Sequence, residues 1–251
     1  MCELVDSAAP SPLDSSYDCN PSISGSSQPL PERASVNQTS PPETKAIYSP
    51  QSARDTLGEG VLPCPPQGIP AQKRLLRAQM RRTRATLPPQ EREANTEALA
   101  ACVALHIFND AKTIFGYYPL HGEADILPLL YALASRGKGL ALPAVDDDGL
   151  MRFYPWKPGD TLSRGTLNVL EPVRARPVIP QKNDVIITPG VAFDVRGNRM
   201  GQGAGYYDSY FARHQKGVRL GAAHACQIVE NVPHTENDIP MHGVLPYMPV
   251  L

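Results

Sequence analysis

The hydrophobic and polar positions divide the chain into two parts near residue 70. Residues 1–70 are dominated by Ser, Pro and small polar residues, and they contain few large apolar side chains. Such a segment buries too little surface to offset the roughly 1–2 kcal/mol per residue that ordering a backbone costs. The pattern therefore predicts a disordered tail over residues 1–70 and a folded domain over residues 71–251.

Helical and strand-like patterns alternate along the domain. Two helices are expected first, at 71–87 and 90–106, because apolar side chains recur at helical spacing and two prolines end the first helix. Apolar or β-branched runs at 112–118, 139–145, 184–188 and 218–223 then predict strands, with helices at 126–135 and 206–214 between them. Unbroken apolar strands separated by helices indicate an α/β fold with an open, mostly parallel sheet and helices on both faces.

Loops that follow strands are the places to look for a site, because an open α/β sheet binds its ligand at the carboxyl ends of the strands. Three such loops are expected, at 117–125, 189–208 and 224–242. The second contains the run GQGAGYYD, from Gly201 to Asp208, directly before a predicted helix. A glycine-rich turn at a helix N-terminus presents unpaired N–H groups to an anion.

Two interpretations of this glycine loop stay open from the residues alone. No GK[ST] follows, so the loop is not a Walker A motif, and it is not the GxGxxG dinucleotide fingerprint either. The loop is therefore either a phosphate cradle or a structural turn. Asp208 either ligates a magnesium ion or caps its helix, and the residues alone favour the cap.

Other polar residues carry similar alternatives. Lys73 and Arg77 lie four residues apart, one turn along the same helix face, where they either grip a polyphosphate or belong to a solvated charged face. The solvated face is the more common outcome for a basic run. Glu123 and Asp125 follow a predicted strand and are placed to meet ligand N–H groups, although Asp125 also stands at a normal N-cap position.

Composition excludes several classes of function. The formal net charge is −1, which points neither to nucleic acid nor to an anionic membrane. Five scattered cysteines without a CxxC pair indicate a reduced, cytosolic protein. The chain contains no apolar run long enough to cross a bilayer, no secretory signal pattern, and neither an HExxH nor a GxSxG motif.

Five motifs occur in a distinctive order. KRLLR opens the domain, YYPLHGEAD follows the first strand, LEP stands at 170–172, PGVAFDVRGNRMGQGAGYYD spans 189–208, and VPHTENDIPM follows Gln227. Over about residues 71–246 this order resembles the 5-formyltetrahydrofolate cyclo-ligase family, also called 5,10-methenyltetrahydrofolate synthetase. The resemblance implies an open α/β fold and the conversion of 5-formyltetrahydrofolate into 5,10-methenyltetrahydrofolate. ATP and Mg²⁺ are required in that reaction, and ADP and phosphate are the other products.

The resemblance also implies roles for individual residues. Lys73, Arg77 and Arg199 match positions that bind ATP, as do the loop residues Gly201, Gln202, Gly203, Ala204, Gly205, Tyr206 and Tyr207. Asp208 and Asp238 match the magnesium ligands. Folate contacts match Tyr118, Glu123, Gln202, Gly203, Ala204, Gly205 and Tyr206, and the catalytic positions among all of these are Glu123, Gln202 and Tyr206. We expect small-molecule partners only, without nucleic acid or membrane, and a monomer in the cytoplasm.

The chain departs from the family pattern at a few positions. Many relatives have Arg or Lys where this chain has Gln202, so one positive charge near the transferred phosphate is expected to be missing. Ser209, the run Val244-Leu245-Pro246 and the long tail also differ from the pattern. Two other hypotheses therefore stay open: a catalytically weak folate- or nucleotide-binding protein, for example a reservoir of 5-formyltetrahydrofolate, and, more weakly supported, an interaction protein that acts through its tail.

Overall fold

The computed structural model of the chain describes residues 68–165 and 168–247. The predicted tail lies outside these ranges, apart from its last three residues. Helix α1 (Ile69–Ala85) begins within those three, two residues before the expected start, with Pro70 in its first turn. Proline suits this position because it needs no N–H partner there and its φ already matches the helix. The expected boundary at residue 71 therefore falls inside the first turn of α1.

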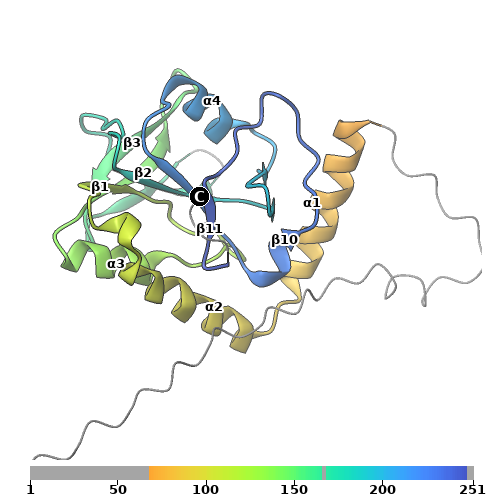
Figure 1. Cartoon of the computed structure of the whole chain (residues 1–251). Helices are drawn as coiled ribbons and strands as arrows, with labels where there is room; N and C mark the ends of the chain where they lie inside the picture. The colour runs from red at the N-terminus through yellow and green to blue at the C-terminus, as the bar shows by residue number, and fades with distance from the viewer. Residues whose placement is uncertain (1–67, 166–167, 248–251) are drawn as a thin grey trace, which may run out of the picture. The chain divides into compact units, whose positions relative to one another are not determined.

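A six-stranded sheet forms the centre of the domain (Figure 1). Neighbouring strands are parallel, except for the antiparallel pair at one edge. This confirms the open, mostly parallel sheet expected from the apolar runs. In spatial order the strands are β11 (Gly243–Leu245), β9 (Val218–Ala222), β6 (Val185–Pro189), β1 (Thr113–Phe115), β2 (Gly139–Val145) and β3 (Met151–Trp156).

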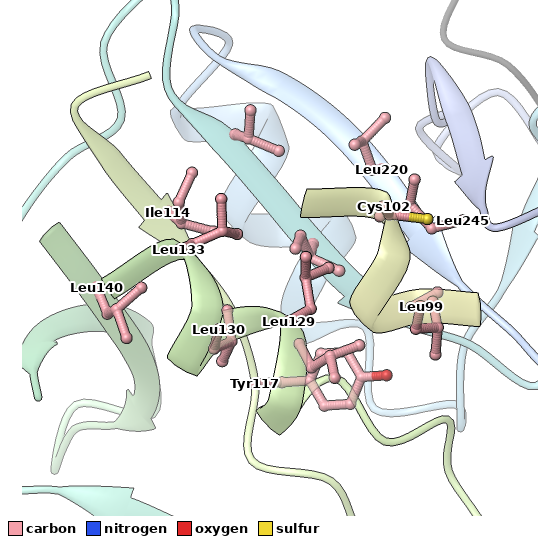
Figure 2. Close-up of a cluster of buried hydrophobic side chains, with 14 of the residues drawn as sticks. Leu99, Cys102, Ile114, Tyr117, Leu129, Leu130, Leu133, Leu140, Leu220 and Leu245 are labelled. Carbon is pink, nitrogen blue, oxygen red and sulfur yellow. The ribbon is translucent and has the colours of Figure 1, made fainter. Parts of the chain in front are cut away.

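Helices cover both faces of this sheet. Side chains alternate between the faces along a strand, so Val185 and Ile187 of β6 join one buried cluster while Ile186 joins another. The first cluster is completed by α2 (Pro89–Ala101) and α3 (Leu127–Ser135), and Figure 2 shows its leucines packed between these helices and the sheet. The second cluster is completed by α4 (Tyr206–Arg213) on the opposite face.

Aromatic packing in the second cluster fixes α4, and with it the loop that leads into α4. The ring of Phe153 makes edge contacts with Phe115 at 5.2 Å and with Tyr210 of α4 at 5.0 Å between centroids. Phe193 fills the space beside Gly190 and Gly221, where a Cβ atom would come within 2.4 Å of the ring. The strands around the glycine loop are thus held by a close-packed interior that tolerates little displacement.

Several boundaries differ from the expected ones. The second predicted helix ends at Ala101 and continues as the short 3₁₀ turns η1 (Cys102–Ala104) and η2 (His106–Phe108). The sequence pattern missed β3 and β11, as well as the two small sheets and the 3₁₀ turn η4. Strand β3 spans six residues but is interrupted by Pro155, which weakens a strand pattern. The other missed elements are runs of two or three residues, which carry almost no periodicity. These missed elements are β4 (Leu162–Arg164) paired with β5 (Leu170–Pro172), the sheet of β7 (Ala192–Asp194), β8 (Arg199–Met200) and β10 (Ile228–Val229), and η4 (Ala225–Gln227).

The helices of the described part are short or polar. None of them is both long enough and apolar enough to cross a membrane.

Candidate functional site

A cavity of about 320 Å³ opens at the carboxyl ends of β1, β2 and β6. Its wall is built from α1, the loop after β1, the end of β2, and the segment from Pro189 to Asp208. Every residue that the family resemblance assigns to the site lines this one cavity. The fold therefore brings together positions that are separated by as much as 165 residues along the chain.

The glycine loop adopts backbone angles that need glycine. Gly203 has a φ of 119° and Gly205, the N-cap of α4, has a φ of 73°. Both values lie in the region that side chains with a Cβ atom rarely adopt. The loop thereby turns sharply into α4, and no side chain caps the first N–H groups of that helix, which is the arrangement that favours an anion. This geometry makes the loop both a turn and a candidate phosphate cradle.

One face of α1 is fastened to this loop and to the segment before β11. Nζ of Lys73 donates to Oδ2 of Asp238 at 2.6 Å, and Nε of Arg77 donates to the carbonyl oxygen of Gly201 at 3.0 Å. One turn further on, Nη2 of Arg81 donates to Oε1 of Gln202 at 3.1 Å. The interpretation of Lys73 and Arg77 as a solvated face is therefore wrong, since both side chains are half-buried against the domain.

Arg199 is the most buried cation of the site, with 3% of its side chain exposed. Its Nη2 donates to Oδ1 of Asp208 at 3.0 Å, and its guanidinium lies 5.4 Å from the ring centroid of Tyr207. Its Nε has no hydrogen-bond partner among the described residues. A buried donor without a partner is costly, so this atom is suited to receive a ligand acceptor.

Asp208 does not cap α4, contrary to the interpretation that its position alone favoured. The N-cap is Gly205, and no side chain caps the helix. Instead, Oδ1 of Asp208 accepts from Arg199 and from the backbone N–H of Ile239 at 3.4 Å. The carboxylate therefore points across the cavity wall toward the segment that carries Asp238.

Asp238 is held as an anion by its neighbours. Burial raises its pKa, but hydrogen bonds from Lys73 and from the N–H and hydroxyl groups of Thr235 outweigh this and lower the pKa below its usual value. All three of these bonds go to Oδ2. Asp208 and Asp238 thus each keep one carboxylate oxygen that forms no hydrogen bond or ion pair with the described residues.

These two oxygens fit a hard cation better than a structural metal centre. The described residues contain no group of three or more His, Cys, Asp or Glu side chains that could hold a metal by themselves. Mg²⁺ is commonly bound by only one or two carboxylates, with phosphate oxygens and water completing its shell. The donor set therefore suits Mg²⁺ in the company of a phosphate ligand.

Glu123 lies in the loop after β1 and lines the cavity. Its Oε2 accepts from the N–H of Leu120 at 3.0 Å. Burial raises the pKa of its carboxyl above the usual value, and three interactions oppose this: the Leu120 hydrogen bond, the charge of Arg84 and a hydrogen bond from the Gln202 side chain. Glu123 is thus a half-buried acceptor at the cavity wall.

The loop that carries Glu123 is tied down at its next residues. The hydroxyl of Tyr117 donates to the carbonyl oxygen of Ala124 at 2.7 Å. Oδ1 of Asp125 accepts from the N–H of Leu127 at 2.9 Å, in the first turn of α3. Asp125 therefore serves the helix start, as expected, although Ile126 occupies the N-cap position itself. Tyr118 lies beside Glu123 along this wall of the cavity.

A buried carboxylate, that of Asp194, organises the turn between β7 and β8. Its Oδ1 accepts from the N–H groups of Arg196 and Asn198, and its Oδ2 accepts from Nδ2 of Asn198 and the N–H of Val232, all within 3.0 Å. Burial raises the pKa of Asp194, but these hydrogen bonds lower it below the usual value. The turn delivers Arg199 to the cavity, so Asp194 supports the site without touching it.

The sequence patterns alone did not assign two groups of residues that the structure adds. Glu171, quoted only within the LEP motif, is 4% exposed and lines the cavity together with Val145, Met151 and Val169. Arg81 reaches Gln202 at the rim. The signal for Glu171 was an acid inside an otherwise apolar run, and the signal for Arg81 was its spacing of four residues from Arg77.

Known proteins of one kind match this chain. Residues 69–246 match the family described as the 5-formyltetrahydrofolate cyclo-ligase family. The 5-formyltetrahydrofolate cyclo-ligase of Escherichia coli K12 is 35% identical over 170 residues, which are 65% of this chain and 93% of that protein. The enzyme of the same name from Haemophilus influenzae is 29% identical over 181 residues, covering 69% of this chain and 97% of the relative.

Solved structures lead to the same group. The solution structure of Aquifex aeolicus 5,10-methenyltetrahydrofolate synthetase matches with a TM-score of 0.60 and 33% identity, over 68% of this chain and 88% of that one. A 5,10-methenyltetrahydrofolate synthetase from Mycoplasma pneumoniae shares the fold, with a TM-score of 0.56 and 21% identity.

Proposed function

The chain belongs to the 5-formyltetrahydrofolate cyclo-ligase family, and we propose that it converts 5-formyltetrahydrofolate and ATP into 5,10-methenyltetrahydrofolate, ADP and phosphate in the presence of Mg²⁺. One observation carries the proposal. A single cavity gathers three cations, two carboxylates and a half-buried acceptor around a glycine loop. Cations, carboxylates and the loop suit a metal-bound triphosphate, and the acceptor suits a heterocycle that carries N–H groups.

The chemical difficulty is the formyl oxygen, which leaves poorly as hydroxide. Transfer of the terminal phosphoryl group of ATP to this oxygen forms an O–P bond and releases ADP. The N10 amine then attacks the formyl carbon, a C–N bond forms, the C–O bond breaks with phosphate as the leaving group, and the N10 proton is released. The protein is left with positioning the reactants and stabilising charge, as in other phosphoryl transfers.

We assign the phosphates to the cationic side of the cavity. Three cations line the cavity with the glycine loop there: Lys73, Arg77 and Arg199. Nε of Arg199 is a buried donor without a hydrogen-bond partner among the described residues. Gly203 and Gly205 let the backbone approach the phosphates closely, since neither carries a Cβ atom. Preorganised donors of this kind stabilise the charge that moves between the oxygens during transfer.

We assign Mg²⁺ to Asp208 and Asp238. Each keeps one carboxylate oxygen that forms no hydrogen bond or ion pair with the described residues, and phosphate oxygens would complete the shell. Bound there, the metal ion neutralises phosphate charge.

We assign the folate to the wall formed by Tyr118 and Glu123, with its formyl end toward Gln202 and Tyr206. The carboxylate of Glu123 is an acceptor only, which suits the N–H donors of a reduced pterin. A single chain supplies every assigned residue, so we propose that a monomer suffices. The cytoplasmic location is a prediction that rests on the five scattered cysteines, which form no CxxC motif.

The test is direct. Purified protein is mixed with 5-formyltetrahydrofolate, ATP and Mg²⁺, and the near-ultraviolet absorbance of the methenyl product is followed. We expect product that depends on ATP. Folate binding without any product would instead support the reservoir hypothesis, which the neutral Gln202 in the loop keeps in view.

A further inference from the structure

Arg81 completes a row of three cations along α1. Lys73, Arg77 and Arg81 are spaced four residues apart, so they lie on neighbouring turns of one helix face. Each of them contacts a different part of the site: Asp238, the carbonyl oxygen of Gly201, and the side chain of Gln202. Arg81 does not line the cavity itself, but Gln202 does. Arg81 therefore stands at the rim, next to the glycine loop.

The glycine loop carries no positive charge of its own. Between Gly201 and Tyr207 the side chains are those of glutamine, alanine, glycine and tyrosine. In the same segment, the cation nearest to the loop is Arg199, which precedes it. Arg199 is buried and forms an ion pair with Asp208. Helix α1 brings two guanidinium groups to the loop, that of Arg77 at Gly201 and Gly203 and that of Arg81 at Gln202.

Gln202 is placed to hold that guanidinium in position. Its Oε1 accepts from Nη2 of Arg81 at 3.1 Å, while its side chain also hydrogen-bonds the carboxylate of Glu123. An amide can accept at oxygen and donate at nitrogen, so one neutral side chain serves both neighbours. The charge of Arg81 consequently stays at the loop without being cancelled by direct pairing with Glu123.

We propose that Arg81 is a further nucleotide-binding residue, and that it contacts the terminal phosphate of the triphosphate from the rim of the glycine loop while Gln202 positions its guanidinium. This rests on the proposed function, because it needs a triphosphate in the loop. A guanidinium has five N–H donors, and the bond to Gln202 uses one of them, so the others are left for phosphate oxygens. The Arg81–Gln202 bond is exposed and contributes little to stability, so its removal leaves the fold intact.

The experiment compares Arg81→Gln with Arg82→Gln. Arg82 is the matched control because it is an exposed cation of the same helix, adjacent in sequence, on the side that faces away from the site. Calorimetric titration measures the Kd of the protein for three ligands: the β,γ-imido analogue of ATP with Mg²⁺, ADP with Mg²⁺, and 5-formyltetrahydrofolate. If Arg81 contacts the terminal phosphate, Arg81→Gln removes that contact. We then expect triphosphate binding to weaken about tenfold, with the affinities for ADP and folate unchanged. Arg82→Gln is expected to match the wild type for all three ligands.

A second variant tests the position of the charge. Placing it directly in the loop with Gln202→Arg, in the Arg81→Gln background, is expected to restore most of the triphosphate affinity. Unchanged triphosphate affinity in Arg81→Gln would overturn the proposal, and so would an equal loss for the triphosphate, ADP and folate, since that pattern marks a structural role. A wild-type protein that binds folate but no triphosphate would overturn the proposed function together with this inference. Normal wild-type binding with no effect of Arg81→Gln would overturn the inference alone.

Discussion

The ammonium group of Lys73 lies 2.6 Å from Oδ2 of Asp238, although 165 residues separate them along the chain. Arg199 and Asp208 form a second pair of the same kind, with 3.0 Å between Nη2 and Oδ1. In each pair, a cation that we assign to the phosphates neutralises a carboxylate that we assign to the metal. The charges within these two pairs are therefore balanced before any ligand binds, and a ligand of either sign alone also meets a group that repels it.

Nucleotide and metal are therefore expected to bind together rather than independently. Phosphates that pair with Lys73 and Arg199 leave the carboxylates of these two ion pairs without a cation. In the absence of Mg²⁺, these carboxylates repel the phosphates. We expect chelation of Mg²⁺ to weaken ATP binding at least tenfold, measured by calorimetry in the absence of folate. A double variant, Asp208→Asn with Asp238→Asn, should have lost this dependence on the metal. Equal ATP affinity of the wild type with and without Mg²⁺ would contradict the arrangement.

Replacing Asp208 alone is expected to stop turnover while leaving the fold in place. Asp208→Asn keeps an oxygen for Arg199 but removes the charge that the metal needs, so we expect a loss of at least a hundredfold in kcat. Product absorbance measures the rate, and a thermal melt checks the fold. Glu93→Gln, an exposed acid on α2, serves as the control and should keep its full rate. A near-normal rate for Asp208→Asn would remove Asp208 from the metal site.

The ionised carboxylate of Glu123 is expected to lower the stability of the fold and to strengthen folate binding. Burial raises the pKa of its carboxyl above the usual 4.5, so its ionised form is less favourable in the fold than in the unfolded chain. The stability that the protonated form provides is lost as the pH rises through this raised pKa. Glu123→Gln should therefore be slightly more stable than the wild type at pH 7.

The same substitution should weaken folate binding about tenfold or more, because a charged acceptor becomes a neutral amide. Since the carboxylate is the acceptor, folate affinity of the wild type should rise with pH through the raised pKa, and Glu123→Gln should lack this rise. Titrations of 5-formyltetrahydrofolate between pH 4 and 8, with thermal melts alongside, measure both effects. Identical pH profiles of the two proteins would rule out Glu123 as the acceptor.

Asp194 is expected to be costly to replace, because it is fully buried and accepts four hydrogen bonds. Asp194→Asn turns an acceptor into a donor opposite the N–H of Val232 and the amide of Asn198, so we expect a loss of about 3 kcal/mol in the free energy of unfolding. Asp147→Asn, whose side chain is fully exposed, should change stability by less than about 0.5 kcal/mol.

The cost at Asp194 should also depend on pH. Its pKa is lowered in the fold, so its contribution is present above about pH 4, near its value in the unfolded chain, and is lost as the pH falls through the lowered pKa. The difference in the free energy of unfolding between the wild type and Asp194→Asn should therefore become smaller in acid. Denaturant unfolding at pH 7 and pH 3 measures it, and a difference that stays constant would mean that the charge of Asp194 is not involved.

Removal of residues 1–67 is expected to leave the activity unchanged. The match to the family begins at residue 69, and α1 begins at Ile69, so every residue assigned to the site is retained. The shortened chain must keep Ile69 and Pro70, because the first turn of α1 leads directly to Lys73. Its rate of product formation and its melting temperature are compared with those of the full chain. A large loss of rate would show that the predicted tail acts on the site.

The sequence by itself determined the class of fold and most of the long elements. Apolar runs such as 139–145 and 184–188 predicted buried parallel strands, and the helices at 126–135 and 206–214 agree with the structure to within a residue or so. The order of motifs also determined the family. These features are local, because a backbone conformation and a sequence motif depend on neighbours along the chain. Most strands of two or three residues escaped prediction, since so short a run carries almost no periodicity and is held by pairing with its neighbours in the sheet; β1, which lies within the predicted run 112–118, is the exception.

Only the tertiary structure decided how the charged residues are partnered. Nothing local distinguishes Lys73, which meets Asp238, from Arg74, which stays exposed, until α1 docks against the domain. The same docking brings Arg81 to Gln202, and the turn organised by Asp194 directs Arg199 toward Asp208 rather than leaving Asp208 to cap its helix. Electrostatic contacts depend on separation in space and on burial, and packing sets both. The sequence named the residues of the site, whereas the fold determined which of them act on one another.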